Sequence, residues 1–189
     1  MKSVKNKQLL VAADMGGFLL KEAVCAHLRE KGWEITDIGM QSLDEENPEM
    51  FHRMGIRAGA KVAEKEFDRA ILFCGTGMGI HIAASKVPGI HSAVVESVPA
   101  ALRAITGNGV NVLCMGGNYV AFQMGIEIAE AFLNNDLGTG YEWWPNFYEF
   151  HKLAIDEMDA FDYEEYKANG FKMKTLGEVD LDISYIKNK

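Results

Sequence analysis

The strongest limit on the fold comes from RAILFC at residues 69–74, an almost wholly apolar run that leads directly into a glycine-rich segment. A half-buried strand alternates apolar and polar side chains, so an unbroken apolar run predicts a strand covered on both faces. Sheets covered on both faces are mostly parallel sheets with helices packed on either side. The run therefore predicts a central strand of a layered α/β domain.

Short β-rich runs alternate with helical patterns along roughly the first 135 residues. Strands are expected at 8–13, 34–38, 69–74, 91–95 and 111–115. Helices are expected at 18–31, at 50–64, from the turn at 75–79 to about residue 86, at 99–105 and at 119–133. This order implies right-handed crossovers between parallel strands. We predict a three-layer α/β/α sandwich with a five-stranded, parallel, Rossmann-like sheet.

Ligands of such sheets bind where the strands end at their carboxyl edge, beside a switch in strand order. In this chain, the residues at that edge are Asp14, Cys74, Glu96 and Gly116. The functional site is therefore expected there.

Bulk composition excludes several classes of protein. The formal net charge of −8 disfavours a nucleic-acid partner, because phosphate binding requires clustered Lys and Arg. No stretch approaches the roughly 20 apolar residues that span a bilayer. Cys25, Cys74 and Cys114 are odd in number and lack metal-ligand spacing, which favours a reduced cytosolic setting. We expect a cytoplasmic protein without a metal, a membrane or a nucleic acid as partner.

The chain changes character near residue 138. GYEWWPNFYEF at 140–150 has six aromatic residues around Pro145, and an acidic helix is expected at about 151–166. A solvated linker would not contain so many aromatics. We therefore expect an α/β domain at 1–137 and an extension at 138–189 that docks on this domain or on a neighbouring subunit. Two roles for the aromatics stay open, extra core packing and lining of the active site.

The strongest functional motif is FCGTGMGIHIAASK at 73–86. Glycines at 75, 77 and 79 permit a tight turn from the buried strand into a helix. Such a turn directs main-chain N–H groups at one spot, which favours an anion. Cys74 stands at the entrance of this turn, where a thiolate is stabilised and can act as a base or a nucleophile.

Several chemistries that use a glycine-rich turn do not fit. The spacing GTGMG breaks the dinucleotide fingerprint, and the Gly-Lys-Ser/Thr of a phosphate-binding P-loop is absent. A cysteine phosphatase would have arginine at position 80, where this chain has Ile80. No histidine is placed specifically enough to pair with Cys74 in a hydrolase. What remains is proton abstraction beside a carbonyl, with the loop amides stabilising an enediolate.

The motif C-G-T-G-x-G-I-x-I-A-A-x-K resembles the signature loop of the ribose-5-phosphate isomerase B and galactose-6-phosphate isomerase family. The resemblance extends to A-D-x-x-G-F-x-L-K at 13–21, G-I-x-x-A-V-V at 89–95 and N-x-x-N-V-L at 108–113. It covers about residues 8–135 in consistent order. Four collinear motifs are far more specific than any one of them.

The resemblance implies a cofactor-free aldose–ketose isomerase of a sugar or sugar phosphate. It implies a homodimer, or a dimer of dimers, with sites at the subunit interface. Cys74 resembles the base that moves a proton between C1 and C2, and Asp14 resembles a carboxylate that contacts sugar hydroxyls. The catalytic residues implied in this way are Cys74 and Thr76, and the substrate-binding residues are Asp14, Met15, Gly75, Gly77, Met78, Gly79 and Asn108.

This chain departs from the family at the positions for ring opening and phosphate binding. Met15 replaces the histidine of the usual Asp-His pair, Gly107 replaces the ring-opening histidine, and no arginine follows Arg103. The substrate could be open-chain, such as a short ketose phosphate, or it could lack a phosphate and pack on aromatics of the extension. In a third alternative, the missing roles have passed to another residue, one of His52, His81, His91, His151, Lys86 and Lys152.

Two other functions are also compatible with the sequence. One is a sugar or sugar-phosphate binding protein that has lost catalysis. The other is one subunit of a hetero-oligomeric isomerase.

Overall fold

The protein forms a five-stranded, all-parallel sheet with the order β2-β1-β3-β5-β4, which confirms the predicted fold class. The computed structural model describes residues 4–179 and 181–182. A short 3-10 turn at Lys5–Lys7 leads into the sheet. The strands are β1 (Gln8–Ala13), β2 (Glu34–Asp37), β3 (Ala70–Cys74), β4 (Ser92–Val94) and β5 (Val112–Gly116).

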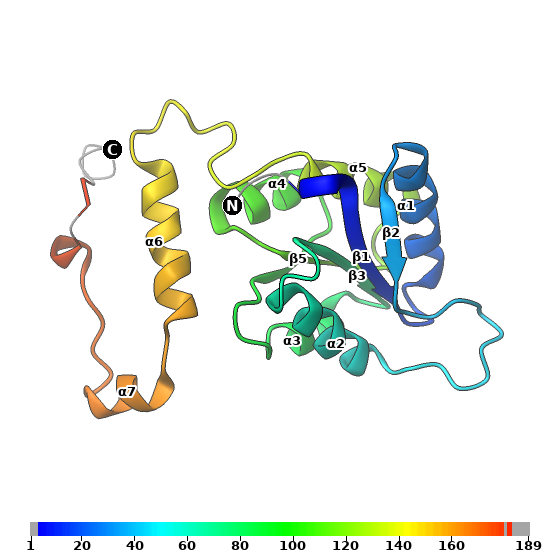
Figure 1. The fold of residues 1–189 in the computed structure, drawn as a ribbon, viewed down its shortest axis with the longest axis horizontal. Helices are drawn as coiled ribbons and strands as arrows, with labels where there is room; N and C mark the ends of the chain where they lie inside the picture. The colour runs from blue at the N-terminus through cyan, green and yellow to red at the C-terminus, as the bar shows by residue number, and fades with distance from the viewer. Residues whose placement is uncertain (1–3, 180, 183–189) are drawn as a thin grey trace.

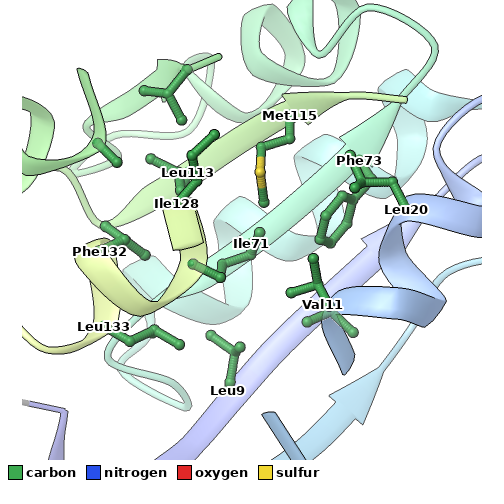
Figure 2. Close-up of a cluster of buried hydrophobic side chains, with 14 of the residues drawn as sticks. Leu9, Val11, Leu20, Ile71, Phe73, Leu113, Met115, Ile128, Phe132 and Leu133 are labelled. Atoms are coloured by element: carbon green, nitrogen blue, oxygen red, sulfur yellow. The ribbon is translucent and has the colours of Figure 1, made fainter. Parts of the chain in front are cut away.

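Helices cover both faces of the sheet (Figure 1). One face is covered by α1 (Phe18–Glu30), α4 (Val98–Asn108) and α5 (Phe122–Leu133), and the other by α2 (Phe51–Ala63) and α3 (Met78–Ala84). Each strand directs alternate side chains to the two layers. Figure 2 shows the first layer, where Ile71 and Phe73 of β3 pack with Leu113 of β5 and with helix residues such as Ile128. β3 is buried along its whole length, as its apolar run predicts.

Helix boundaries differ from the prediction where local turns intervene. α4 is longer than expected because the Ser97 side chain caps its start and Gly109, with φ of 59°, ends it in the left-handed region. α5 starts later because the amides of Tyr119 and Val120 turn back to the Gly116 carbonyl. α3 ends at Ala84, two residues short of the expected end.

The extension contains α6 (Phe147–Asp159), α7 (Tyr163–Ala168) and a 3-10 turn at Leu176–Glu178. The prediction of one helix at 151–166 is wrong, because Asp162 accepts a hydrogen bond from the Glu165 amide and starts a new helix. Figure 1 shows the chain running along α6, turning at α7 and returning beside α6. The Asn146 side chain accordingly donates to the Asp182 carbonyl at 3.3 Å. Residues 183–189 of the predicted extension lie outside the described residues.

α6 contacts the sandwich at the carboxyl end of α4. A Cβ on Gly109 would lie 2.6 Å from Cδ1 of Ile155, so the two helices pack closely there. His91 Nε2 also lies 2.8 Å from Oδ1 of Asp159 at the end of α6. Within the described residues, no helix is long and apolar enough to cross a bilayer.

Candidate active site

Three loops meet at the carboxyl edge of the sheet, following β1, β3 and β5. The Asp14 amide donates to the Phe73 carbonyl at 3.3 Å, and the Gly117 amide donates to the Cys74 carbonyl at 2.9 Å. The Asn118 amide donates to the Gly75 carbonyl at 3.0 Å. These bonds join the loops into one unit, which we call the cradle and define as residues 14–17, 74–77 and 116–118.

Glycines allow the cradle loops to touch main chain against main chain. A Cβ on Gly117 would lie 2.2 Å from the Gly16 carbonyl oxygen, and one on Gly17 would lie 2.5 Å from the Phe73 carbonyl carbon. A Cβ on Gly16 would lie 2.7 Å from the Gly75 Cα. Heavy atoms do not approach this closely, so any side chain here would force the loops apart.

Cys74 lies at the centre of the cradle. Its side chain is only 4% exposed, and its Sγ accepts a hydrogen bond from the Gly77 amide at 3.1 Å. Gly77 has φ of +75°, which turns the chain back so that its N–H faces the sulfur. The predicted contact between Cys74 and a main-chain amide of the glycine-rich turn is therefore present in the geometry.

Thr76, Met78 and Gly79 continue the turn into α3. Thr76 Oγ1 accepts a hydrogen bond from the Met78 amide at 3.3 Å, so the hydroxyl hydrogen can be donated elsewhere. The Met78 side chain is largely exposed. A Cβ on Gly79 would lie 2.5 Å from the Phe51 ring, because the start of α2 packs directly on this turn.

Asp14 is held by main chain on the β1 side of the cradle. Its Oδ1 accepts a hydrogen bond from the Gly17 amide at 3.1 Å. Burial raises the pKa of this carboxyl, and the amides of Gly17 and Gly16 partly oppose the rise. The neighbouring Met15 is 59% exposed and brings no titratable group to the position where the family usually has histidine.

Asn118 belongs to the cradle but is not among the predicted site residues. Its Nδ2 is 3.3 Å from the point where a Cβ on Gly75 would lie. The sequence did contain a signal, because GGN directly follows the fifth strand at the carboxyl edge. Asn118 adds a neutral hydrogen-bond donor across the turn from Asp14.

Asn108, by contrast, does not reach the cradle within one chain. It precedes β5, whose Val112 pairs with Ala70 at the start of β3, whereas Gly116 pairs with Cys74 at its end. Four residues of strand span roughly 13 Å, so Asn108 and Cys74 lie at opposite edges of the sheet. The Asn108 side chain donates to the Arg103 carbonyl at 3.1 Å.

The aromatics of the extension form a cluster of their own beside α4. Tyr141 stacks on Phe147 with ring centres 4.0 Å apart, and Trp144 meets the same ring edge-on at 5.0 Å. Tyr141 also lies beneath the Arg103 guanidinium, 4.7 Å from its central carbon. This arrangement favours the packing role over the role of lining the cradle.

The candidate substitutes on the sandwich are engaged away from the cradle. His81 Nδ1 lies 2.7 Å from Ser92 Oγ at the start of β4, and burial lowers the pKa of this imidazole. His91 pairs with Asp159 as described above. In the extension, His151 lies 2.8 Å from the Phe147 carbonyl and Lys152 pairs with Asp156.

The other two cysteines are core residues. Cys25 and Cys114 are fully buried. Burial raises the pKa of Cys25 to about 12 and raises that of Cys114 as well. Both are neutral thiols at physiological pH, and neither lies at the carboxyl edge of the sheet, where Cys74 ends β3.

Comparisons with known proteins identify the relatives of this chain. Residues 9–142 match the family model described as Ribose/Galactose Isomerase. The chain is 41% identical to 4-deoxy-4-sulfo-D-erythrose isomerase of Clostridium sp. (strain MSTE9) over 85% of this chain and 98% of that protein. It is 34% identical to D-erythrulose-4-phosphate isomerase 2 of Mycolicibacterium smegmatis, over 71% of this chain and 86% of the relative.

A solved structure agrees with these matches. Ribose-5-phosphate isomerase B of Clostridium thermocellum superposes with a TM-score of 0.72 at 27% identity, covering 85% of this chain and 99% of that one. Fold, motifs and relatives thus point the same way. The chain belongs to the ribose/galactose isomerase family and is an aldose–ketose isomerase.

Proposed function

We propose that this enzyme isomerises an open-chain, four-carbon sugar with an anionic group on C4, a sulfonate or a phosphate ester. The observation that supports this most directly is Gly107. It stands where the family usually has the ring-opening histidine, and nothing lies within 4 Å of the point where its Cβ would be. The space that the first atom of a side chain would occupy at this position is therefore open.

The chemistry of four-carbon sugars explains why a histidine is dispensable. A tetrose aldehyde closes a five-membered ring through its C4 hydroxyl. A sulfonate on C4, or a phosphate ester of the C4 hydroxyl, removes this nucleophile, so the sugar stays open and no ring has to be broken. Two relatives are named as isomerases of such sugars, one of 4-deoxy-4-sulfo-D-erythrose and the other of D-erythrulose 4-phosphate.

The cradle supplies the groups for proton transfer between C1 and C2. The Cys74 thiolate takes the C2 proton, the C2–H electron pair forms the C1–C2 double bond, and the carbonyl pair moves onto O1. The Thr76 hydroxyl and the loop amides stabilise the enediolate, and Asp14 orients a hydroxyl. The Cys74 thiol then returns its proton to C1 while O2 loses its proton, O1 gains one and the C2 carbonyl forms.

The participation of Asn108 requires a second copy of the chain. Asn108 precedes β5, and the strand from Val112 to Gly116, which lies beside Cys74, alone spans roughly 13 Å, much more than the length of a four-carbon chain. A homodimer with shared sites would bring Asn108 of one copy to the cradle of the other. β4 is an edge strand, so no strand of the described residues pairs with its outer side.

The first experiment compares Cys74→Ala and Cys74→Ser with Cys114→Ala as the matched control in the neighbouring strand. Turnover of 4-deoxy-4-sulfo-erythrose, erythrulose 4-phosphate and ribose 5-phosphate is followed in D₂O. We expect the wild type to turn over a four-carbon substrate with solvent deuterium at the accepting carbon. Both Cys74 variants should lose at least about 10²–10⁴-fold in kcat, the usual range for a lost acid–base group. A fully active, folded Cys74→Ala protein would refute the assignment.

The second experiment tests whether the site is shared between copies. Cys74→Ala and Asn108→Ala proteins are each assayed alone, then unfolded together and refolded as a mixture. In a shared-site dimer, about half of the randomly paired molecules are mixed and have one intact site, so about a quarter of the wild-type activity returns. No recovery would place both residues in the site of one chain or remove Asn108 from the site.

A further inference from the structure

A second polar cavity runs along the edge strand β4, between α3 and α4. Its volume is about 580 Å³. The end of α6 closes one side through Met158. Its polar lining consists of Arg103, Asn108, His91, Ser85 and Ser92.

The charge of this cavity is opposite to that of the chain. The chain has a formal net charge of −8, yet no side chain among the described residues that line this cavity is acidic. His91 is matched by Asp159, which lies 2.8 Å away behind it. Arg103 has no carboxylate partner among the described residues, and its charge is therefore available for a ligand.

Arg103 is held in place by its own surroundings. The guanidinium lies over the Tyr141 ring, with 4.7 Å between its central carbon and the ring centre. Stacking fixes the plane of the guanidinium and leaves its N–H groups at the edge for hydrogen bonding. A planar pair of donors fits the oxygens of a sulfonate or a phosphate. Ser85 Oγ and Ser92 Oγ also line the cavity, but they lie 2.7 Å apart and both bond to His81, so they are already engaged.

Arg103 and Asn108 lie on the same helix, five residues apart. Five residues of α-helix span about 7.5 Å, the same order as the length of a tetrose that ends in a sulfonate. The Asn108 side chain bonds to the Arg103 carbonyl, and Gly107 between them adds no side chain. A contact that brings Asn108 to the cradle of another copy therefore brings Arg103 with it, because both residues lie on α4.

We infer that Arg103 binds the anionic C4 group of the substrate held in the cradle of the partner copy. This inference rests on the proposed function, since it presumes a substrate with such a group and a shared site. It assigns the role of the phosphate-binding arginines, which this chain lacks after position 103, to a residue in the middle of α4.

The test uses two substrates that differ only by the sulfonate group on C4. 4-Deoxy-4-sulfo-erythrose and 4-deoxy-erythrose both lack the C4 hydroxyl and stay open, but only the first is anionic. Arg103→Met keeps the aliphatic stem, Arg103→Lys keeps the charge, and Arg29→Met is the control at an exposed arginine of α1. Tm values confirm that each variant is folded.

Arg103→Met should raise KM for the sulfonated substrate by about 10–100-fold, the usual effect of losing hydrogen bonds to a charged group. Its kcat should change little, and kinetics on 4-deoxy-erythrose should match the wild type. Arg103→Lys should retain part of the affinity, and Arg29→Met should retain all of it. The same series with erythrulose 4-phosphate distinguishes a site for phosphate from a site for sulfonate.

If Arg103→Met raised KM equally for the sulfonated and the neutral substrate, Arg103 would have a structural role and the inference would be overturned. An unchanged KM for the sulfonated substrate would overturn it as well. Mixing Arg103→Met with Cys74→Ala at low substrate should restore about a quarter of the wild-type rate if the two residues come from different copies. No recovery would overturn the placement in the partner's site. Thermal shift with the sulfonated tetrose needs no turnover, so it tests Arg103 even if the wild type proves inactive and the proposed function fails.

Discussion

The cradle consists almost entirely of main chain, whereas the Arg103 cavity consists of side chains from β4, α4 and α6. In the cradle, Gly16, Gly75 and Gly117 bring three loops into direct contact. Its only polar side chains are those of Asp14, Cys74, Thr76 and Asn118. In the cavity, Arg103 and His91 are held by Tyr141 and Asp159 of the extension. Main-chain sites tolerate few substitutions, while side-chain sites change readily. Under the proposals above, this chain would carry out proton transfer in a main-chain site and recognise the anionic group in a side-chain site.

The largest contrast is expected in thiol reactivity. Burial raises the pKa of Cys25 to about 12, so only about 10⁻⁴ of it is thiolate at pH 8, and Cys114 is raised as well. Cys74 has the Gly77 amide on its sulfur and lies at the sheet edge. Iodoacetamide should therefore modify Cys74 at least about 100-fold faster than the other two, because the thiolate is the reactive form.

Peptide mass spectrometry after timed alkylation measures the three rates. Substrate should slow the modification of Cys74 and leave Cys25 and Cys114 unchanged. Equal rates at the three thiols in folded protein would remove the distinction between a cradle cysteine and a core cysteine.

Adding one methyl group to a cradle glycine should be costly, while adding one to Gly107 should not. In Gly117→Ala, the new Cβ would lie 2.2 Å from the Gly16 carbonyl oxygen. We expect a loss of about 2–3 kcal/mol in the free energy of unfolding and a large loss of activity, because two loops must separate. In Gly107→Ala, nothing lies within 4 Å of the new Cβ, and a gain of up to about 1 kcal/mol is expected from helix propensity. Chemical denaturation of both variants measures the difference, and equal stability would contradict main-chain contact in the cradle.

The same contrast explains what could be predicted from the sequence. The wholly apolar run at 69–74 and the alternation of elements specify the parallel sheet, and the carboxyl-edge rule brings Asp14 near Cys74. Asn118 was missed because a single asparagine after a glycine pair has no periodicity to distinguish it. The Arg103 cavity could not be predicted, because its walls depend on how α6 packs against α4. The separation of Asn108 from Cys74 follows from strand register, which motif order alone does not give.

Removing the contact between His91 and Asp159 should lower the stability of the protein moderately, and the change should be confined to the extension. His91 is partly buried and joins the start of β4 to the end of α6. In His91→Ala, we expect a loss of about 0.5–1 kcal/mol and faster hydrogen exchange in α6, since the helix loses one of its contacts with the sandwich. Lys152→Met is the control, because it removes an ion pair within α6 that makes no link to the sandwich. Equal exchange rates in the two variants would show that the pair does not hold α6.

Replacing the Asp14 carboxylate should raise the stability of the protein but lower its activity. Burial raises the pKa of this carboxyl, against the opposing effect of the Gly17 and Gly16 amides. A carboxyl with a raised folded-state pKa binds its proton more tightly in the folded state, so stability falls as the pH rises from the unfolded value of 3.8 through the folded-state pKa. Asn keeps an oxygen that can accept from the Gly17 amide but carries no charge. Asp14→Asn should therefore be more stable than the wild type at pH 7, by no more than about 2–4 °C in Tm, and the gap should close toward pH 4.

Tm values measured across this pH range, with Asp44→Asn as an exposed control, decide the sign. The variant should also lose kcat/KM, because a neutral amide orients a substrate hydroxyl less strongly than a carboxylate does. A gap that does not depend on pH would mean that the charge of Asp14 is not the source of the difference. A stability gain together with lost turnover would mean that the cradle retains this charge for catalysis, at a cost to the fold.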